Sequence, residues 1–325
     1  MTVVHDDVTP FLDPPTDPPT DPPTTLRRAR RLAVLGDSTA VGLGDPLPGG
    51  GWRGVGPLVA GAIGVPPAGY LNCAFTGARM RCVRETQLPA ALAHRPDVAL
   101  VVAGMNDTLR SDFDPAAVAA DLDEVVTRLL TAGAVVVPVR YHDHGRVFRL
   151  PGPLHRALRA RIDALNGAVD AVAARRGVPC LDVVAVPGAY DLGAWSVDRL
   201  HPSELGHRLL ARGFTGLLAE AGFAVPAPVG LELSGGAPGG ALDHVAWLVA
   251  KGVPWLWRRG RDLVPYAAGI LLRSALDVGA TRPRPRRVPS VENASGAMPG
   301  EGGSPTTPTT PTTLTTLTTL TTPTT

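Results

Sequence analysis

The feature that most constrains the fold of this chain is an alternation of short apolar runs with longer amphipathic stretches between residues 31 and 219. Each apolar run is rich in Val or Leu and is flanked by Gly, Pro or Asp, which is typical of buried β-strands. We therefore predict five strands, which cover residues 31–36, 68–74, 97–103, 134–140 and 178–184.

The amphipathic stretches between these runs predict helices. Between the third and fourth strands the apolar residues share one helical face, and Asp114 followed by Pro115 favours a helix start. Residues 154–172 repeat the same pattern after the fourth strand. Strands that alternate with such helices form right-handed crossovers, so the sheet is parallel and covered on both faces. The predicted fold class is α/β, a three-layer α/β/α sandwich with a five-stranded parallel sheet and a C-terminal helical appendage.

A serine follows the first predicted strand, in the run Gly36, Asp37 and Ser38. In a parallel sheet, reactive groups are expected at the carboxyl ends of the strands. A serine at this place can present its Oγ above the sheet edge as a nucleophile, and the small Gly36 allows a tight turn. Helix capping is the alternative interpretation, because Asp and Ser are favoured capping residues.

An aspartate and a histidine stand three residues apart after the fifth predicted strand, as Asp198 and His201. At this spacing the carboxylate can hold the imidazole in one tautomer and stabilise its positive form. Capping is again the alternative, because His201 precedes Pro202 where we expect the last helix to begin. His207 lies further into that helix without an acidic partner at this spacing, and we expect a structural role for it.

Two further strand ends offer hydrogen-bond donors. Gly77 follows the second strand and could supply an unobstructed backbone N–H, and Asn106 follows the third strand and could supply its side-chain amide. Gly and Asn are also ordinary loop residues, so turn chemistry is the alternative for each. A serine, two donors and an Asp/His pair after four strands of one sheet nevertheless indicate an acyl-transfer site.

From about residue 31 to residue 219 the sequence resembles the SGNH (GDSL-type) hydrolases, and within them an actinobacterial-type esterase branch. The resemblance rests on Gly36-Asp37-Ser38, on Gly77, on the run from Gly104 to Asp107, and on Asp198 with His201. It implies a flavodoxin-like fold, with Ser38 as nucleophile, His201 as base and Asp198 as the residue that orients the base. It also implies an oxyanion hole formed by the Ser38 and Gly77 backbone N–H groups and the Asn106 amide, with no metal or organic cofactor.

These features predict a serine esterase or acylhydrolase that cleaves carboxylic esters, with lipid or small acyl groups. Two alternatives remain open from the sequence. The first is a carbohydrate O-deacetylase on the same scaffold, which loop variation alone can produce. The second is a catalytically silent protein that keeps the scaffold and binds a membrane or a protein partner.

Two other loops contain residues of possible functional type. His142, Asp143 and His144 follow the fourth strand and alternate metal-ligand types, but we expect an exposed polar loop there, because a metal site needs further ligands. Trp52 follows the glycines at 49–51 after the proposed nucleophile. It either shapes the substrate pocket or belongs to the core.

The cysteines and the charge constrain the compartment and the partners. Cys73, Cys82 and Cys180 are an odd number, which fits buried, reduced thiols, with a Cys73–Cys82 disulfide as the alternative. No apolar leader is visible before Arg27, so we predict a cytoplasmic protein. The formal net charge of +2 argues against a nucleic-acid partner, which needs a concentrated basic face.

Composition divides the chain into five parts. Residues 1–25 and 281–325 are rich in Pro and Thr, and we expect disordered tails there. Residues 26–225 form the predicted catalytic domain, and the Gly- and Pro-rich residues 226–240 form a linker. Residues 241–280 form an amphipathic helical segment rich in Trp and Arg.

Three roles are open for this Trp/Arg-rich segment. The first role, which we favour, is docking of its short helices on the catalytic domain. Peripheral membrane contact through residues 241–278 is the second role, because Trp and Arg suit the lipid headgroup region. Binding of a protein partner is the third. The segment does not span a membrane, because charges and prolines interrupt its apolar stretches.

Overall fold

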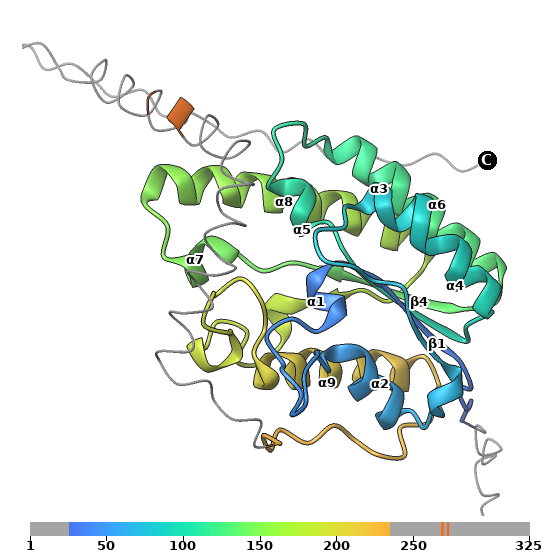
Figure 1. Cartoon of the computed structure of the whole chain (residues 1–325). Helices are drawn as coiled ribbons and strands as arrows, with labels where there is room; N and C mark the ends of the chain where they lie inside the picture. Colours follow the sequence, from blue (N-terminus) through green and yellow to red (C-terminus); the bar gives the residue numbers. More distant parts are fainter. Residues whose placement is uncertain (1–25, 235–267, 270–271, 273–325) are drawn as a thin grey trace, which may run out of the picture. The chain divides into compact units, whose positions relative to one another are not determined.

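The structure is a computed structural model that describes residues 26–234, 268–269 and 272 (Figure 1). Both predicted tails lie outside the described residues, as do residues 235–240 of the predicted linker. The Trp/Arg-rich segment also lies outside them, apart from residues 268, 269 and 272. Within the described part of the chain, no helix is long and apolar enough to cross a membrane.

The centre of the described domain is a parallel sheet with the strand order β2-β1-β3-β4-β5 (Figure 1). The order reverses direction at β1, and in sheets of this kind the functional site lies at the carboxyl ends of the strands beside such a reversal. The strands are β1 (Leu32–Gly36), β2 (Tyr70–Asn72), β3 (Val98–Val102), β4 (Val135–Arg140) and β5 (Leu181–Asp182).

Helices cover both faces of this sheet, which confirms the predicted α/β/α sandwich. In Figure 1, α2 and α9 pack together on one face, and α6 packs on α8 on the other. The α-helices are α1 (Ser38–Val41), α2 (Val55–Ala62), α3 (Met80–Cys82), α4 (Leu88–His94), α5 (Met105–Thr108), α6 (Pro115–Thr131), α7 (His144–Phe148), α8 (Gly152–Arg176) and α9 (Glu204–Glu220). Short 3₁₀ turns cover Pro67–Gly69, Val183–Ala185 and Leu192–Ala194, and a π-helical turn covers Val83–Gln87.

The predicted start of α6 is confirmed in its chemistry. Asp114 is the N-cap, its side chain accepts a hydrogen bond from the Ala116 backbone N–H, and Pro115 occupies the first helical position. This arrangement satisfies one of the free N–H groups of the helix end, and proline costs nothing where the N–H has no partner in the helix.

All five predicted strands are present, but β2 and β5 are shorter than predicted. Before β2, a 3₁₀ turn at Pro67–Gly69 occupies residues that we expected to be extended. At β5, the Asp182 side chain accepts a hydrogen bond from the Val184 N–H and turns the chain into the next 3₁₀ segment. Side chains that bond to their own backbone in this way compete with strand pairing.

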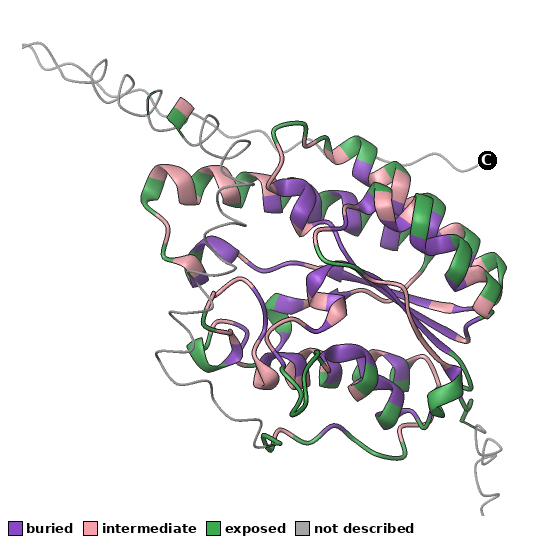
Figure 2. Ribbon diagram, viewed as in Figure 1, coloured by how far each residue is buried: buried purple, intermediate pink, exposed green. Residues whose placement is uncertain are grey.

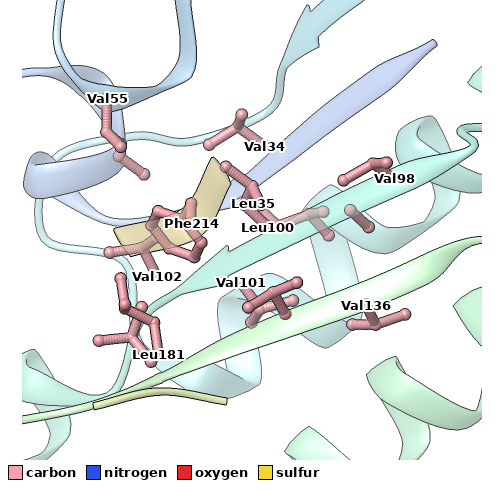
Figure 3. Close-up of a cluster of buried hydrophobic side chains, with 14 of the residues drawn as sticks. Val34, Leu35, Val55, Val98, Leu100, Val101, Val102, Val136, Leu181 and Phe214 are labelled. Atoms are coloured by element: carbon pink, nitrogen blue, oxygen red, sulfur yellow. The ribbon is translucent and has the colours of Figure 1, made fainter. Parts of the chain in front are cut away.

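The core lies on both faces of the central strands. Every residue of β1 and β3 is buried, as the purple strands in Figure 2 show. Figure 3 shows Leu35, Val102 and Leu181 gathered around Phe214 of α9. Burial of each such side chain contributes about 1.5–3 kcal/mol to folding, so the layers hold the sheet edge in a fixed position.

Residues 226–234 run along the α2 and α9 side of the domain (Figure 1). The Ala227 N–H donates to the Ala62 carbonyl at the end of α2, and Val229 is buried. The Ser234 hydroxyl accepts hydrogen bonds from Arg53 and Arg208, and its N–H donates to Glu204 at the start of α9. This part of the predicted linker therefore packs against the domain.

We predict that Gly36→Ala destabilises the fold. Gly36 has a φ of 154°, and a Cβ at this position would overlap the Val102 carbonyl oxygen of the neighbouring strand. The expected loss is roughly 1–3 kcal/mol in the free energy of unfolding, measured by urea denaturation. Gly216→Ala is the matched control, because Gly216 is an exposed interior residue of α9 whose Cβ would meet no other atom. The control should gain up to about 1 kcal/mol, and equal urea midpoints for the two variants would contradict the steric argument.

Candidate active site

A tight turn joins β1 to α1 and places Ser38 at the carboxyl edge of the sheet (Figure 1). The side chain of Gln87 holds the start of this turn, because it accepts a hydrogen bond from the Gly36 N–H and donates one to the Gly36 carbonyl. Asp37 is the N-cap of α1 and accepts a hydrogen bond from the Thr39 N–H. The capping interpretation is therefore met by Asp37, which caps the helix, and Ser38 is the first residue of that helix.

The structure brings Ser38, His201 and Asp198 together in one line of hydrogen bonds. Ser38 Oγ lies 2.8 Å from His201 Nε2, and His201 Nδ1 lies 2.7 Å from Asp198 Oδ2. Ser38 is 9% exposed and His201 is 7% exposed, so little water competes for these bonds. Residues that are 163 positions apart in the chain thus meet in the order that nucleophilic catalysis requires.

The Asp198 carboxylate accepts several further hydrogen bonds. Its Oδ1 accepts from Ser196 Oγ at 2.6 Å, from the Leu200 N–H at 2.8 Å and from the His201 N–H at 3.0 Å. Burial opposes the ionisation of Asp198, but these donors and the His201 ring outweigh it and lower its pKa to about 2. Asp198 is therefore a carboxylate throughout the neutral range.

Asp198 and His201 lie in the loop before α9 and not within that helix. Ser203 is the N-cap, and the helix begins at Glu204. The Ser196 N–H donates to the His201 carbonyl, which closes the loop on itself. Sequence reasoning placed the pair at the start of the last helix, and the structure moves it to the turn immediately before.

Asn106 links the loops that follow three different strands. Its Nδ2 donates to Asp37 Oδ2 at 3.2 Å and to the Ala78 carbonyl at 3.1 Å. Ala78 follows Gly77, whose φ of 85° lies in the left-handed region that favours glycine. The neighbours of Ser38 and of Gly77 are thus both bonded to Asn106, which brings the three predicted donor residues to one place.

The sequence analysis did not identify two residues that hold the loops around Ser38, Gly77 and Asn106. Asp107 is buried, accepts a hydrogen bond from the Met80 N–H and forms an ion pair with Arg79. It therefore holds the loop after β2 against the loop after β3. Gln87 holds Gly36 as described above. Asp107 stood beside Asn106 in the quoted motif, whereas no local pattern marked Gln87.

Asp37 is a buried carboxyl group beside Ser38. Burial raises its pKa to about 6, although the hydrogen bond from Thr39 and the charge of His201 work against the increase. Its nearest donors are the Thr39 N–H and the Asn106 amide. Asp37 is more deeply buried than Asp198 and has fewer donors around it, and together these differences explain the opposite directions of the two pKa shifts.

The loop at residues 142–144 differs from the prediction. His142 is 2% exposed and His144 is 3% exposed, so the expected exposed polar loop is wrong for both histidines. They are buried because their rings pack on Trp195 and because His144 Nδ1 lies 2.9 Å from His142 Nε2. Among the described residues, no group of three His, Cys, Asp or Glu side chains is placed to hold a metal ion.

The remaining candidate residues have plain structural positions. His207 is fully buried, and its Nε2 lies 3.0 Å from the Leu43 carbonyl, in agreement with the structural role expected for it. Trp52 is 38% exposed, so it is not part of the core. The three cysteines are free thiols and are each partly buried, so the alternative Cys73–Cys82 disulfide is wrong.

A parallel α/β sheet that brings serine, histidine and aspartate side chains to hydrogen-bond distance at its carboxyl edge is the framework of a serine hydrolase. The model of the GDSL-like Lipase/Acylhydrolase family matches residues 34–209, which is more than half of the chain. The chain belongs to this family, and the resemblance to the GDSL-type hydrolases seen in the sequence is confirmed. It is an enzyme of the class that hydrolyses ester bonds.

Three solved structures are similar to this chain. The lipase/acylhydrolase from Enterococcus faecalis is 22% identical, with a TM-score of 0.46 over 58% of this chain and 96% of that chain. The acetylxylan esterase Axe2 from Geobacillus stearothermophilus is 20% identical, with a TM-score of 0.48 over 60% of this chain and 96% of that chain. The hydrolase LAE5 from the metagenome of Lake Arreo is 21% identical, with a TM-score of 0.47 over 60% and 98%. No curated protein matches the chain.

We predict that the stability cost of Asp37 depends on pH. In the unfolded chain the carboxyl group ionises near its ordinary pKa of 3.8, whereas in the folded protein it stays protonated up to about pH 6. Between these values the unfolded state binds fewer protons, so folding becomes less favourable as pH rises. Asp37→Asn cannot ionise and escapes this penalty. Its stability relative to the wild type should increase by about 2 kcal/mol between pH 4 and pH 7.

The measurement is urea denaturation of both proteins at the two pH values. The wild type, measured in parallel, cancels the titration of every other group. Hydrogen bonds lost in the variant add a constant that does not change with pH. A stability difference that is the same at pH 4 and pH 7 would contradict the raised pKa of Asp37.

Proposed function

We propose that the protein is a serine esterase that cleaves carboxylic esters, with Ser38 as nucleophile, His201 as general base and Asp198 as the residue that orients the base. The observation that carries this proposal is the pair of short hydrogen bonds from Ser38 Oγ to His201 Nε2 and from His201 Nδ1 to Asp198. One imidazole nitrogen faces the hydroxyl that would lose its proton, and the other faces the carboxylate that would orient the ring.

The proton positions follow from the pKa of Asp198. An ionised carboxylate has no hydrogen to donate, so His201 Nδ1 carries the hydrogen and donates it to Asp198. Neutral His201 then has a lone pair on Nε2, which accepts the Ser38 hydroxyl hydrogen. This is the protonation state in which the serine can lose its proton as it attacks.

The proposed reaction has two stages. Ser38 Oγ attacks the ester carbonyl while its proton moves to His201 Nε2, and the imidazolium then returns this proton to the departing alcohol. The product of the first stage is an acyl group bound to Ser38 through a new ester bond. A water molecule, deprotonated by His201, attacks this bond and releases the acid, and the proton goes back to Ser38 Oγ.

The Ser38 and Gly77 backbone N–H groups and the Asn106 amide are the proposed donors to the tetrahedral oxyanion. The hydrogen bonds of Asn106 to Asp37 and to Ala78 support this proposal, because they hold the amide between the loops that carry Ser38 and Gly77. These bonds use both hydrogens of Asn106 Nδ2, so one of the two hydrogens turns to the oxyanion when charge develops on the oxygen.

The proposed substrates are small-molecule esters with lipid or small acyl groups. The first test is turnover of esters of graded acyl chain length beside a panel of acetylated sugars. Preference for the acyl esters supports the esterase, and preference for the acetylated sugars identifies the carbohydrate O-deacetylase instead. Failure of a fluorophosphonate probe to label Ser38 would overturn both enzyme proposals and leave a silent binding protein.

We predict that Ser38→Ala and His201→Ala each lower kcat by about 10³-fold or more, because each removes a group that takes part in proton transfer or attack. The measurement is hydrolysis of phenyl acetate, with thermal unfolding to show that the variants fold. Ser111→Ala is the matched control, because Ser111 is exposed in the loop before α6. Near-wild-type hydrolysis by Ser38→Ala would show that Ser38 is not the nucleophile.

A separate prediction concerns Asn106. Asn106→Ala should lower kcat by about 10²–10³-fold with a much smaller effect on KM, because an oxyanion donor acts mainly in the transition state. Steady-state kinetics with phenyl acetate measures both constants. A change confined to KM would mean that Asn106 binds the ground-state substrate and would remove it from the proposed oxyanion hole.

Two further proposals concern the cellular location of the protein and the Trp/Arg-rich segment. We keep the cytoplasmic location as a prediction from the sequence. We also propose peripheral membrane contact through residues 241–278, on the Trp and Arg content alone. Co-sedimentation with anionic liposomes tests the contact, and equal sedimentation of chains with and without these residues would overturn it.

A further inference from the structure

An apolar pocket lies beside the proposed catalytic residues. Its lining includes Thr39, which follows Ser38, and Leu200 and Pro202, which flank His201. The rest of the wall is mostly aliphatic or aromatic and comes from the sheet, from α9 and from the loop before α9. It includes Val102, Val139, Val183, Leu209, Trp195 and Phe214. A hydrocarbon group that enters from the reactive serine would be well accommodated here.

Two buried histidines give this pocket a polar region. His142 and His144 both line the pocket, and His144 Nδ1 lies 2.9 Å from His142 Nε2. Among the residues that the structure describes, none offers a hydrogen-bond partner to His142 Nδ1, although the side chain is 98% buried. The nearby Trp195 indole N–H is already bonded to the Ala189 carbonyl. A buried polar atom without a partner is costly, and in a binding pocket it indicates a ligand group that would pair with it.

The loop that carries these histidines is held firmly. Asn166 of α8 accepts a hydrogen bond from the Tyr141 N–H and donates one to the Tyr141 carbonyl. The next residues are fixed as well, since the Asp143 N–H donates to Tyr190 Oη and the Asp143 carboxylate binds His155. Because the backbone is bonded on both sides of His142, the ring is positioned before any ligand arrives.

The charge state of the pair restricts the ligand. Burial lowers the pKa of His142 to about 4 and that of His144 to about 3, so both rings are neutral at neutral pH. If His144 Nδ1 donates within the pair, then His142 Nδ1 carries a hydrogen and is a donor. If His142 Nε2 donates, then His142 Nδ1 is an acceptor. A hydroxyl group both donates and accepts, so it pairs with His142 in either tautomer.

We propose that the pocket receives a hydrocarbon chain or ring that carries a hydroxyl group, and that His142 is the residue that selects the hydroxyl. The proposal rests on the proposed ester hydrolysis and names a substrate class for it. The hydroxylated group can belong to the acyl part or to the alcohol part of the ester. His142 is a specificity-determining residue here and takes no part in the bond-breaking steps.

The experiment has one arm for each part of the ester. The acyl arm compares p-nitrophenyl esters of alkanoic acids with those of the terminally hydroxylated acids, at several chain lengths. The alcohol arm compares alkyl acetates with the corresponding hydroxyalkyl acetates. In one arm the kcat/KM ratio of the hydroxylated ester to the plain ester should exceed about tenfold, because the plain ester leaves His142 unpaired. A ratio near one in both arms overturns the proposal.

Substitutions at His142 test its role through the same ratio, in which any general loss of activity cancels. In His142→Asn the side-chain amide lies where Nδ1 lies, so part of the preference should remain. In His142→Gln the amide reaches the Nε2 position instead, and in His142→Leu no polar atom remains, so the ratio should fall to about one. His94→Leu is the matched control, because His94 lies at the end of α4 against the Gly69 carbonyl, at the opposite edge of the sheet. A wild-type ratio in His142→Leu would overturn the proposal.

A binding measurement separates this proposal from the proposed reaction and does not depend on the folding of the His142 variants. Ser38→Ala is titrated with alkanols and the corresponding diols, and with alkanoic acids and the corresponding hydroxy acids, and thermal stabilisation is recorded. Greater stabilisation by a hydroxylated member supports the pocket assignment even if no ester is hydrolysed. Equal stabilisation within both pairs overturns it even if the enzyme hydrolyses plain esters.

Discussion

Parallel pairing of β1 with both β2 and β3 is the constraint on which the rest of the structure depends. Gly36 at the end of β1 lies opposite Val102 at the end of β3, and Val34 lies opposite Asn72 of β2. Parallel strands in this register end at one edge, so the three loops that follow them begin side by side. The hydrogen bonds of Asn106 to Asp37 and Ala78 are possible only because of this arrangement.

Around this edge the domain buries carboxyl groups in two different ways. Asp198 receives hydrogen bonds from Ser196, from two backbone N–H groups and from His201, and its pKa falls to about 2. Asp37 has fewer donors around it, and burial raises its pKa to about 6. Deeper burial with fewer donors raises the pKa of Asp37, whereas the larger set of donors around the less deeply buried Asp198 lowers its pKa.

The parts of the fold that depend on local chemistry could be predicted from the sequence. Strands β1, β3 and β4 are largely apolar runs, and α6 begins at an Asp–Pro cap. The pattern of apolar residues and the capping residues were therefore enough to predict these elements. The shortening of β5 could not be predicted, because it depends on whether Asp182 bonds to its own backbone or leaves the strand extended. The proposed site residues were found because each follows a strand end. Gln87 was missed because it forms hydrogen bonds with Gly36, which lies 51 positions away in the chain. The burial of His142 was missed because it also depends on a distant residue, Trp195, whose ring packs against the His142 ring.

The steric demand at Gly36 affects what a glycine at this position indicates in the sequences of related proteins. The glycine is required because the Val102 carbonyl of the neighbouring strand leaves no space for a side chain, and this requirement comes from the sheet and not from the reaction. A descendant that lost Ser38, the proposed nucleophile, would still be under the same steric demand for glycine at this position. In a copy of the motif that has lost the serine, a conserved glycine is therefore evidence for the sheet alone and not for the proposed reaction.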